Sequence, residues 1–151
     1  MYKRMIALRT SLALLASYDF VVGAIAAFAP RMFYDSFPFF ASWVRVLPPY
    51  NEHLVRDVGG LYLGLGVIVA WAACARGPSI VRAACAGSLV VGALHLSFHA
   101  SHLDGMHTGS AIVELSGLAA VVLLPVLALW LVGTVPTLTI SAKRGSRQRL
   151  S

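Results

Sequence analysis

The sequence predicts an all-α fold, an integral membrane four-helix bundle with an interfacial segment after the first span. Of the 151 residues, 58% are apolar and only 12% are charged, about half the charged share of a soluble domain. The mean hydropathy is +0.78. Four stretches approach the roughly 20 apolar residues that cross a bilayer. This composition excludes a disordered chain, and it argues against a soluble enzyme or a nucleic-acid-binding domain, because so much apolar surface cannot be buried in water.

The first span is predicted at residues 10–29 and carries one charge, Asp19. Its basic start and its Ala27-Phe28-Ala29 ending are features of cleaved signal peptides. The long apolar run and the carboxylate in its middle favour a retained helix instead, and Asp19 then lies near the bilayer midplane.

Three further spans complete one membrane domain. They are predicted at residues 54–75, 81–103 and 111–133, followed by a basic tail at 134–151. Arg56 and Asp57 stand at the start of the second span, and Glu114 lies in the first turns of the fourth.

The segment between the first two spans, residues 30–53, is too long for a tight turn and is dense in aromatic residues. Six of them lie in its first part: Phe33, Tyr34, Phe37, Phe39, Phe40 and Trp43. Aromatic residues beside a span are typical of anchoring at headgroup depth, which is the favoured interpretation. The alternative is a lid that folds over the bundle.

The distribution of Lys and Arg predicts the orientation. Nine of the twelve fall on one side of a four-span layout: Lys3, Arg4, Arg9, Arg76, Arg82, Lys143, Arg144, Arg147 and Arg149. The other side holds Arg31, Arg45 and Arg56. Because basic loops stay in the cytoplasm, both termini are predicted to be cytoplasmic. The positive charge is therefore a topology signal, and no nucleic-acid partner is expected.

Small residues suggest where helices meet. Gly60 and Gly64 have the GxxxG spacing that permits close helix contact, within the chain, in a homo-oligomer or with a membrane partner. Cys74 and Cys85 flank the second loop on its cytoplasmic side. A disulfide is not expected there, and both are interpreted as packing residues.

The ionisable residues gather in the outer half of the predicted bundle. His95, His99 and His102 have the i, i+4, i+7 spacing of one helix face. The rest of this set is Glu52, His53, Arg56, Asp57, Asp104, His107 and Glu114, with Asp19 deeper. Because charges inside a membrane are costly, they are expected to face the bundle interior. Arg56 is expected to neutralise Asp57, Glu114 or Asp19.

Three interpretations of this cluster remain open: a structural ion-pair network, a metal site, and a small-molecule site that handles protons. The candidates for ligand binding or proton handling are Asp19, Arg56, Asp57, His95, His99 and Glu114. The candidate metal ligands are His95, His99, His102 and Glu114. The corresponding cofactors are a divalent metal or a quinone.

Two runs also carry a family resemblance: NEHLVRDVGGLYL at 51–63 and HLSFHASHLDG at 95–105. They resemble segments of small uncharacterised actinobacterial membrane proteins, and the four-span layout resembles the DoxX-like group. The resemblance implies a bacterial plasma-membrane protein in a redox or quinone context.

The leading expectation is an accessory protein that binds a ligand or metal. The alternative is a quinone- or lipid-linked oxidoreductase subunit with His95, His99 and Glu114 as acid–base groups.

Overall fold

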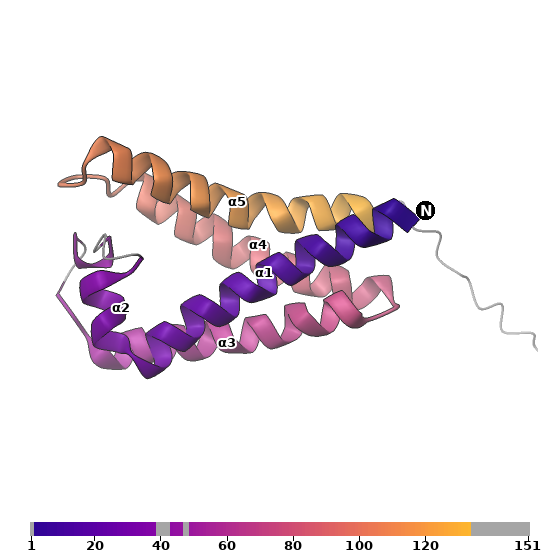
Figure 1. Cartoon of the computed structure of the whole chain (residues 1–151), viewed down its shortest axis with the longest axis horizontal. Coiled ribbons are helices and arrows are strands. Elements are labelled where there is room, and N and C mark those ends of the chain that lie inside the picture. Colours follow the sequence, from indigo (N-terminus) through magenta and orange to yellow (C-terminus); the bar gives the residue numbers. More distant parts are fainter. Residues whose placement is uncertain (1, 39–42, 47–48, 134–151) are drawn as a thin grey trace, which may run out of the picture.

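Four long helices form the body of the molecule (Figure 1). The computed structural model describes residues 2–38, 43–46 and 49–133, and within these ranges the chain has no strand. The long helices are α1 (Tyr2–Phe28), α3 (Glu52–Cys74), α4 (Pro78–Ala100) and α5 (Thr108–Gly133). The short helix α2 (Pro30–Ser36) and the single 3-10 turn η1 (Val44–Val46) follow α1. The predicted all-α four-helix bundle is confirmed.

All four long helices, of 27, 23, 23 and 26 residues, are long and apolar enough to cross a membrane. Their outward faces carry large apolar side chains that nothing in the described chain covers. Leu61, Trp71, Leu94, Leu123 and Trp130 are between 61% and 73% exposed. A bilayer solvates such a surface and water does not, so the chain is a membrane protein.

Local signals set several helix boundaries. Asn51 caps α3, its Oδ1 accepting a hydrogen bond from the Leu54 N–H at 3.2 Å. Pro78 occupies the first turn of α4, where the missing N–H costs nothing. At the other end of α4 the Ser101 hydroxyl lies 2.9 Å from the Phe98 carbonyl oxygen. The helix therefore stops at Ala100, three residues before the predicted end of the span.

The bundle has two ends of different character. The start of α1, the α3–α4 connection and the end of α5 lie together at one end (Figure 1). We call the half of the bundle near them the basic half, because Lys3, Arg4, Arg9, Arg76 and Arg82 belong to it. The opposite half contains α2, η1 and the α4–α5 loop, and we call it the pocket half.

The hydrophobic core lies in the basic half, where all four helices meet. Its most deeply buried members include Leu12, Leu15, Val69, Cys85 and Ala128, each at most 1% exposed. The interpretation of Cys85 as a packing residue therefore agrees with the structure. Cys74 is exposed instead, and neither cysteine forms a disulfide.

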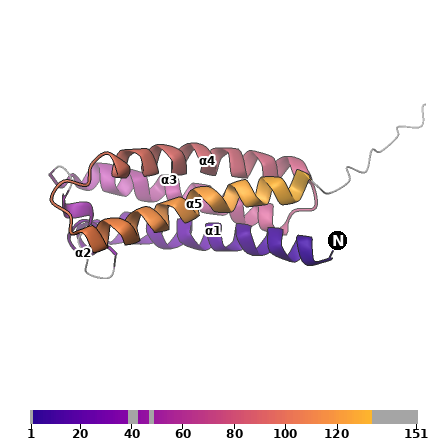
Figure 2. The same cartoon turned by 90° about the horizontal axis from the view of Figure 1, so that it is seen from above.

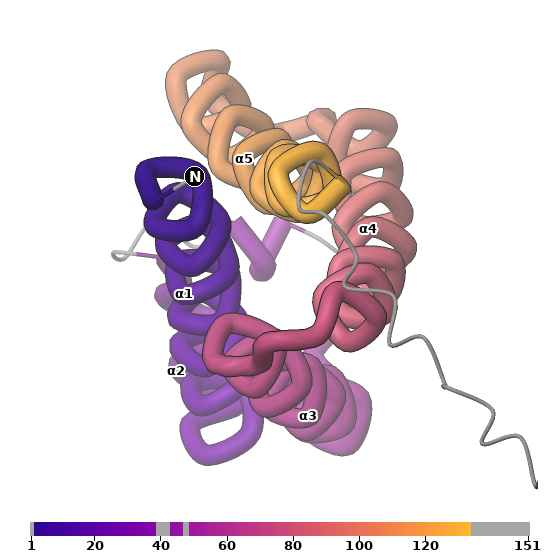
Figure 3. The backbone as a smooth tube through the Cα atoms, turned by 90° about the vertical axis from the view of Figure 1, so that its right-hand side faces the viewer, coloured from indigo at the N-terminus to yellow at the C-terminus, as the bar shows by residue number. Residues whose placement is uncertain are grey.

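The helices pack as two pairs, α1 with α3 and α4 with α5 (Figures 2 and 3). Glycine permits the closest approach in the first pair. A Cβ atom on Gly59 would lie 2.3 Å from the Ala27 backbone nitrogen, and one on Gly23 would lie 2.8 Å from the Leu63 nitrogen. In the second pair, a Cβ on Gly92 would lie 3.3 Å from a methyl group of Val122. Larger side chains at Gly59 or Gly23 would push α1 and α3 apart.

Of the alternatives open for Gly60 and Gly64, the contact with another helix of the same chain is not observed in the described structure. A Cβ atom on either would meet nothing within 4 Å in the described structure. Successive helix residues are about 100° apart around the axis, so Gly59 can face α1 while Gly60 faces outward. Contact with a second chain through Gly60 and Gly64 stays a prediction.

Candidate functional site: a pocket between the two helix pairs

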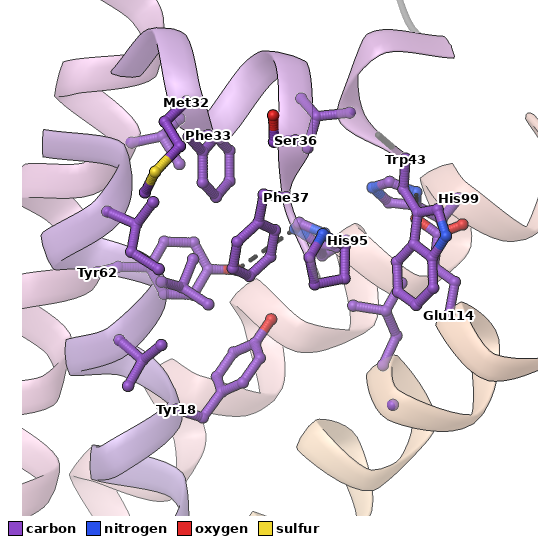
Figure 4. Close-up of a pocket in the computed structure, with 18 of the residues that line it drawn as sticks. Tyr18, Met32, Phe33, Ser36, Phe37, Trp43, Tyr62, His95, His99 and Glu114 are labelled. Atoms are coloured by element: carbon purple, nitrogen blue, oxygen red, sulfur yellow. Dashed lines mark hydrogen bonds and ion pairs between the residues drawn. The ribbon is translucent and has the colours of Figure 1, made fainter. Parts of the chain in front are cut away.

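A cavity of about 710 Å³ opens in the pocket half, between the two helix pairs (Figure 4). Its wall is overwhelmingly apolar, and its volume falls within the range of about 300–1,000 Å³ that is typical of small-molecule pockets. The lining residues come from all four long helices and from the segment after α1: Ser17, Tyr18, Val21, Val22, Ile25, Met32, Phe33, Ser36, Phe37, Pro38, Trp43, Val44, Val58, Tyr62, His95, His99, Glu114, Gly117 and Leu118.

The aromatic segment after α1 forms the outer wall of this pocket. Phe33, Phe37 and Trp43 line the cavity, and the Phe33 and Phe37 rings stack with centroids 4.8 Å apart. These side chains therefore face the cavity, which is the position that the lid alternative predicts. Phe39 and Phe40, which belonged to the same aromatic pattern, lie outside the described residues.

The closest polar contact in the pocket joins α4 to α5. His99 Nδ1 lies 2.6 Å from Glu114 Oε1, with the two side chains 12% and 5% exposed. The sequence predicted this contact, because helices joined by a short loop pack antiparallel and their facing turns meet. The pair brings together two candidate site residues from neighbouring helices.

A second polar contact lies beside the first, and the two together form a short row of polar side chains that extends toward the other helix pair. His95 Nδ1 lies 3.3 Å from the Tyr62 hydroxyl on α3, and the rings of His95 and His99 stack with centroids 4.6 Å apart. Tyr18 on α1 meets Tyr62 edge-on, with centroids 6.1 Å apart. The polar side chains thus run from α1 and α3 across to α4 and α5 (Figure 4).

Sequence reasoning missed Tyr18, Tyr62 and Trp43 as site residues. Tyrosine and tryptophan are common in membrane helices and at membrane interfaces for packing and anchoring alone. Only their place in the wall of the same cavity as the histidines distinguishes them. Tyr62 lies within the run at 51–63 that carries the family resemblance, which was the one available signal.

Two buried polar atoms in the pocket residues have no hydrogen-bond partner within the described chain. They are Glu114 Oε2 and Trp43 Nε1. Buried polar atoms are nearly always paired, since leaving one unpaired costs about 1–3 kcal/mol. Both residues line the same cavity, so a bound molecule is a natural partner for both.

Arg56 and Asp57 do not join the site, and the prediction that they face inward is wrong. Arg56 Nε lies 2.9 Å from Glu52 Oε1, and its guanidinium also donates to the Ala27 carbonyl oxygen. Asp57 Oδ2 lies 3.2 Å from His53 Nε2. The Arg56 and Asp57 side chains are 47% and 56% exposed: Arg56 lies beside the end of α1, and Asp57 lies on the outward side of the first turns of α3.

Asp19 is buried, as expected of a carboxyl in mid-membrane, but it does not line the cavity. Its side chain is 1% exposed and packs against α3, where a Cβ on Gly66 would lie 3.2 Å from Asp19 Cβ. Asp19 Oδ2 has no partner in the described residues. Arg56 therefore does not neutralise Asp19, which takes its place in the packing between α1 and α3.

His102 breaks the predicted three-histidine face. Because α4 ends at Ala100, His102 leaves the helix, stacks on Phe98 with centroids 4.1 Å apart, and is exposed. Its Nδ1 lies 2.8 Å from the Phe98 carbonyl oxygen. Over the described ranges, no three His, Cys, Asp or Glu side chains gather to hold a metal. The four-residue metal set proposed from sequence is therefore not assembled.

The fold and site define a class: an all-α membrane protein with an apolar pocket that contains a short polar row. Comparison of the chain with protein-family models, curated proteins and solved structures finds no match. The resemblance to the DoxX-like group therefore stays a prediction.

Proposed function

We propose that this protein binds an apolar small molecule with a polar head in the pocket between its two helix pairs, as an accessory membrane protein. The observation that carries the proposal is the cavity of about 710 Å³ with an apolar wall and a short polar row from Tyr62 to Glu114. Ligand pockets typically combine a mostly apolar wall with a few polar groups that orient the ligand.

The two orphaned atoms support ligand binding over a purely structural role. A self-sufficient ion-pair network would satisfy both oxygens of Glu114, whereas only Oε1 has a partner in the described structure. A bound head group that pairs with Oε2 would remove the cost of burying it unpaired.

The test uses Trp43 as a reporter inside the pocket. The sequence has three tryptophans, so Trp43 is the one that remains when Trp71 and Trp130 are replaced by Phe. In lipid nanodiscs, an octadecyl alcohol brominated along its chain should quench Trp43 fluorescence with a saturable dependence on its mole fraction. A quenching curve without saturation, as for simple lipid contact, would contradict the proposal.

A cavity-filling pair of variants controls this measurement. Gly117 lines the cavity and a Cβ there meets nothing within 4 Å, so Gly117→Phe should fill the pocket without displacing a helix. It should abolish the saturable quenching. Gly60→Phe, at an equally open position outside the pocket lining, should leave the quenching unchanged.

A second candidate function is a quinone- or lipid-linked oxidoreductase subunit. The 2.6 Å contact between His99 and Glu114 favours it, because a histidine–carboxylate pair can accept and return a proton. Reduction of a quinone by an added two-electron donor, accelerated by the purified protein but not by His99→Ala, would support this candidate over simple binding.

The basic asymmetry supports a plasma-membrane orientation with both termini in the cytoplasm and the pocket half toward the outer leaflet. A membrane-impermeant thiol reagent added outside bacterial cells should label Asp104→Cys, in the exposed α4–α5 loop, when Cys74 and Cys85 are replaced by Ala. It should miss Gly77→Cys, in the α3–α4 connection. The reverse labelling would turn the pocket toward the cytoplasm.

A further inference from the structure

We propose that the polar head recognised in this pocket is a hydroxyl group on an uncharged amphiphile, such as a long-chain alcohol or a quinol. This inference rests on the proposed function and adds the chemistry of the head group. It follows from the two buried atoms without a partner in the described chain. Glu114 Oε2 needs a hydrogen-bond donor, and Trp43 Nε1–H needs an acceptor.

Glu114 supplies the acceptor. Its side chain is 5% exposed, and Oε1 is engaged by His99 Nδ1 at 2.6 Å. With the proton on Nδ1, the ring donates and the carboxylate accepts, so Oε2 remains an acceptor without a donor in the described residues. A ligand that completes this carboxylate must carry an O–H or N–H group.

Trp43 supplies the donor. The indole Nε1–H can only donate, and it is buried with no acceptor among the described residues. Figure 4 draws Trp43 on the same side of the cavity as His99 and Glu114. A hydroxyl group matches both demands, since it donates one hydrogen bond and accepts others.

The charge of the pocket excludes an anionic head. No Lys or Arg is among the described residues that line the cavity. When Glu114 is ionised, the His99–Glu114 pair is neutral with His99 protonated and negative with His99 neutral, so it offers no net positive charge to an anion. A fatty-acid carboxylate or a phosphate would therefore lose its hydration and gain no compensating cation. The ligand is uncharged at its head.

The experiment compares matched heads on one chain with the Trp43 quenching assay in nanodiscs. The brominated octadecyl alcohol should bind at least about tenfold more tightly than its methyl ether, since the ether cannot donate to the carboxylate and such a bond is worth about 1.5–3 kcal/mol. The corresponding carboxylic acid, ionised at pH 8, should bind most weakly. A second pair of ligands is a brominated alkyl quinol and its quinone. Tighter binding of the quinol than of the quinone and of the alcohol would show that the recognised hydroxyl is on an aromatic ring.

Glu114→Gln should erase or reverse this preference. The glutamine carbonyl oxygen can accept from His99, which leaves its NH₂ group as a donor where Oε2 was an acceptor. The methyl ether should then bind at least as tightly as the alcohol. Asp19→Asn, a buried carboxyl outside the pocket lining, is the matched control and should keep the wild-type ratio.

Trp43→Phe, followed with tritiated ligands, should weaken alcohol and ether alike and leave their ratio unchanged, because both oxygens accept from the indole. Equal binding of alcohol and ether to the wild type would overturn the hydroxyl inference while leaving the pocket proposal intact. Saturable binding of none of the ligands would instead overturn the proposed function itself. If Glu114→Gln does not fold, the ratio of alcohol to ether binding in the wild-type protein alone tests the hydroxyl inference.

Discussion

The two halves of this bundle are made from the same four helices and are built on opposite principles. In the basic half, all four helices close on an apolar core that includes Leu12, Val69 and Cys85. In the pocket half, each helix pair stays closed through a glycine contact while the pairs separate around a cavity. The aromatic segment after α1 lines that cavity where the two helix pairs lie apart.

The difference teaches where stability and function are divided in a small membrane protein. A close-packed interior has no room for a ligand, so the basic half can contribute only stability. In the pocket half the two pairs lie apart around the cavity. It also contains buried polar atoms whose burial costs free energy unless they have a hydrogen-bond partner. Core substitutions in the basic half should therefore change stability alone, whereas substitutions in the pocket wall should also change ligand binding. Three pairs of variants test the contacts on which this difference depends.

The largest effect is expected at the glycine contact that holds α1 on α3. Gly59→Leu would place atoms within 2.3 Å of the Ala27 backbone, and backbone cannot move aside as a side chain can. We expect loss of the folded bundle, measured as loss of the monodisperse peak in detergent and of cooperative thermal unfolding.

Gly64→Leu is the matched control for Gly59→Leu. It lies on the same helix, and its Cβ would meet nothing within 4 Å. We expect a change in unfolding free energy within about 0.5 kcal/mol, as for ordinary surface substitutions. A large destabilisation would reveal a second chain packed on this face, and would revive the Gly60/Gly64 contact predicted from sequence.

An intermediate effect is expected at the buried polar pair of the pocket half. His99→Ala leaves Glu114, 5% exposed, without its partner. Breaking a buried pair costs about 3–5 kcal/mol in soluble proteins, and we expect the same order here, measured by unfolding in mixed micelles.

His102→Ala is the control for the pair, because His102 is exposed and off the helix. It should change the unfolding free energy by less than about 0.5 kcal/mol. Equal destabilisation by both variants would mean that the histidines act as one face, which is the arrangement that the sequence predicted and the structure contradicts.

The smallest difference in stability between two variants is expected for two apolar truncations, and it is also the most informative comparison. Leu12→Ala, in the core of the basic half, should cost about 2–5 kcal/mol and leave ligand binding unchanged, because Leu12 is 1% exposed and remote from the pocket lining. Phe33→Ala, in the pocket wall, should cost less stability and weaken ligand binding several-fold. If Phe33→Ala affects stability alone, the segment after α1 is a structural plug and no lid.

Much of the architecture follows from the sequence because the bilayer imposes it. Uncharged stretches of span length must become helices, since no other open structure satisfies the backbone in lipid. The same reasoning placed Asp19 in the interior, and the short α4–α5 connection predicted the contact between His99 and Glu114, as observed.

The errors in the candidate site came from rotation about the helix axis and from helix ends. Arg56 and Asp57 lie at the predicted level, yet Arg56 binds the end of α1 and Asp57 pairs with His53 on the exposed side of α3. His102 has the right spacing for the histidine face, yet α4 ends before it. Spacing determines which residues share a face only while the helix continues, and it does not determine which face meets a neighbour.

The sequence by itself determined the class of protein, the four spans and the half of the bundle in which ionisable groups gather. These depend on composition and on periodicity along the chain, which are local properties. Only the tertiary structure decided that Gly59 and Gly23 hold one helix pair together and that the pairs separate in one half. It also decided that Tyr62 contacts His95 there and that Trp43 lines the same cavity. Those features depend on how the helices rotate and cross, and packing between distant residues sets that geometry.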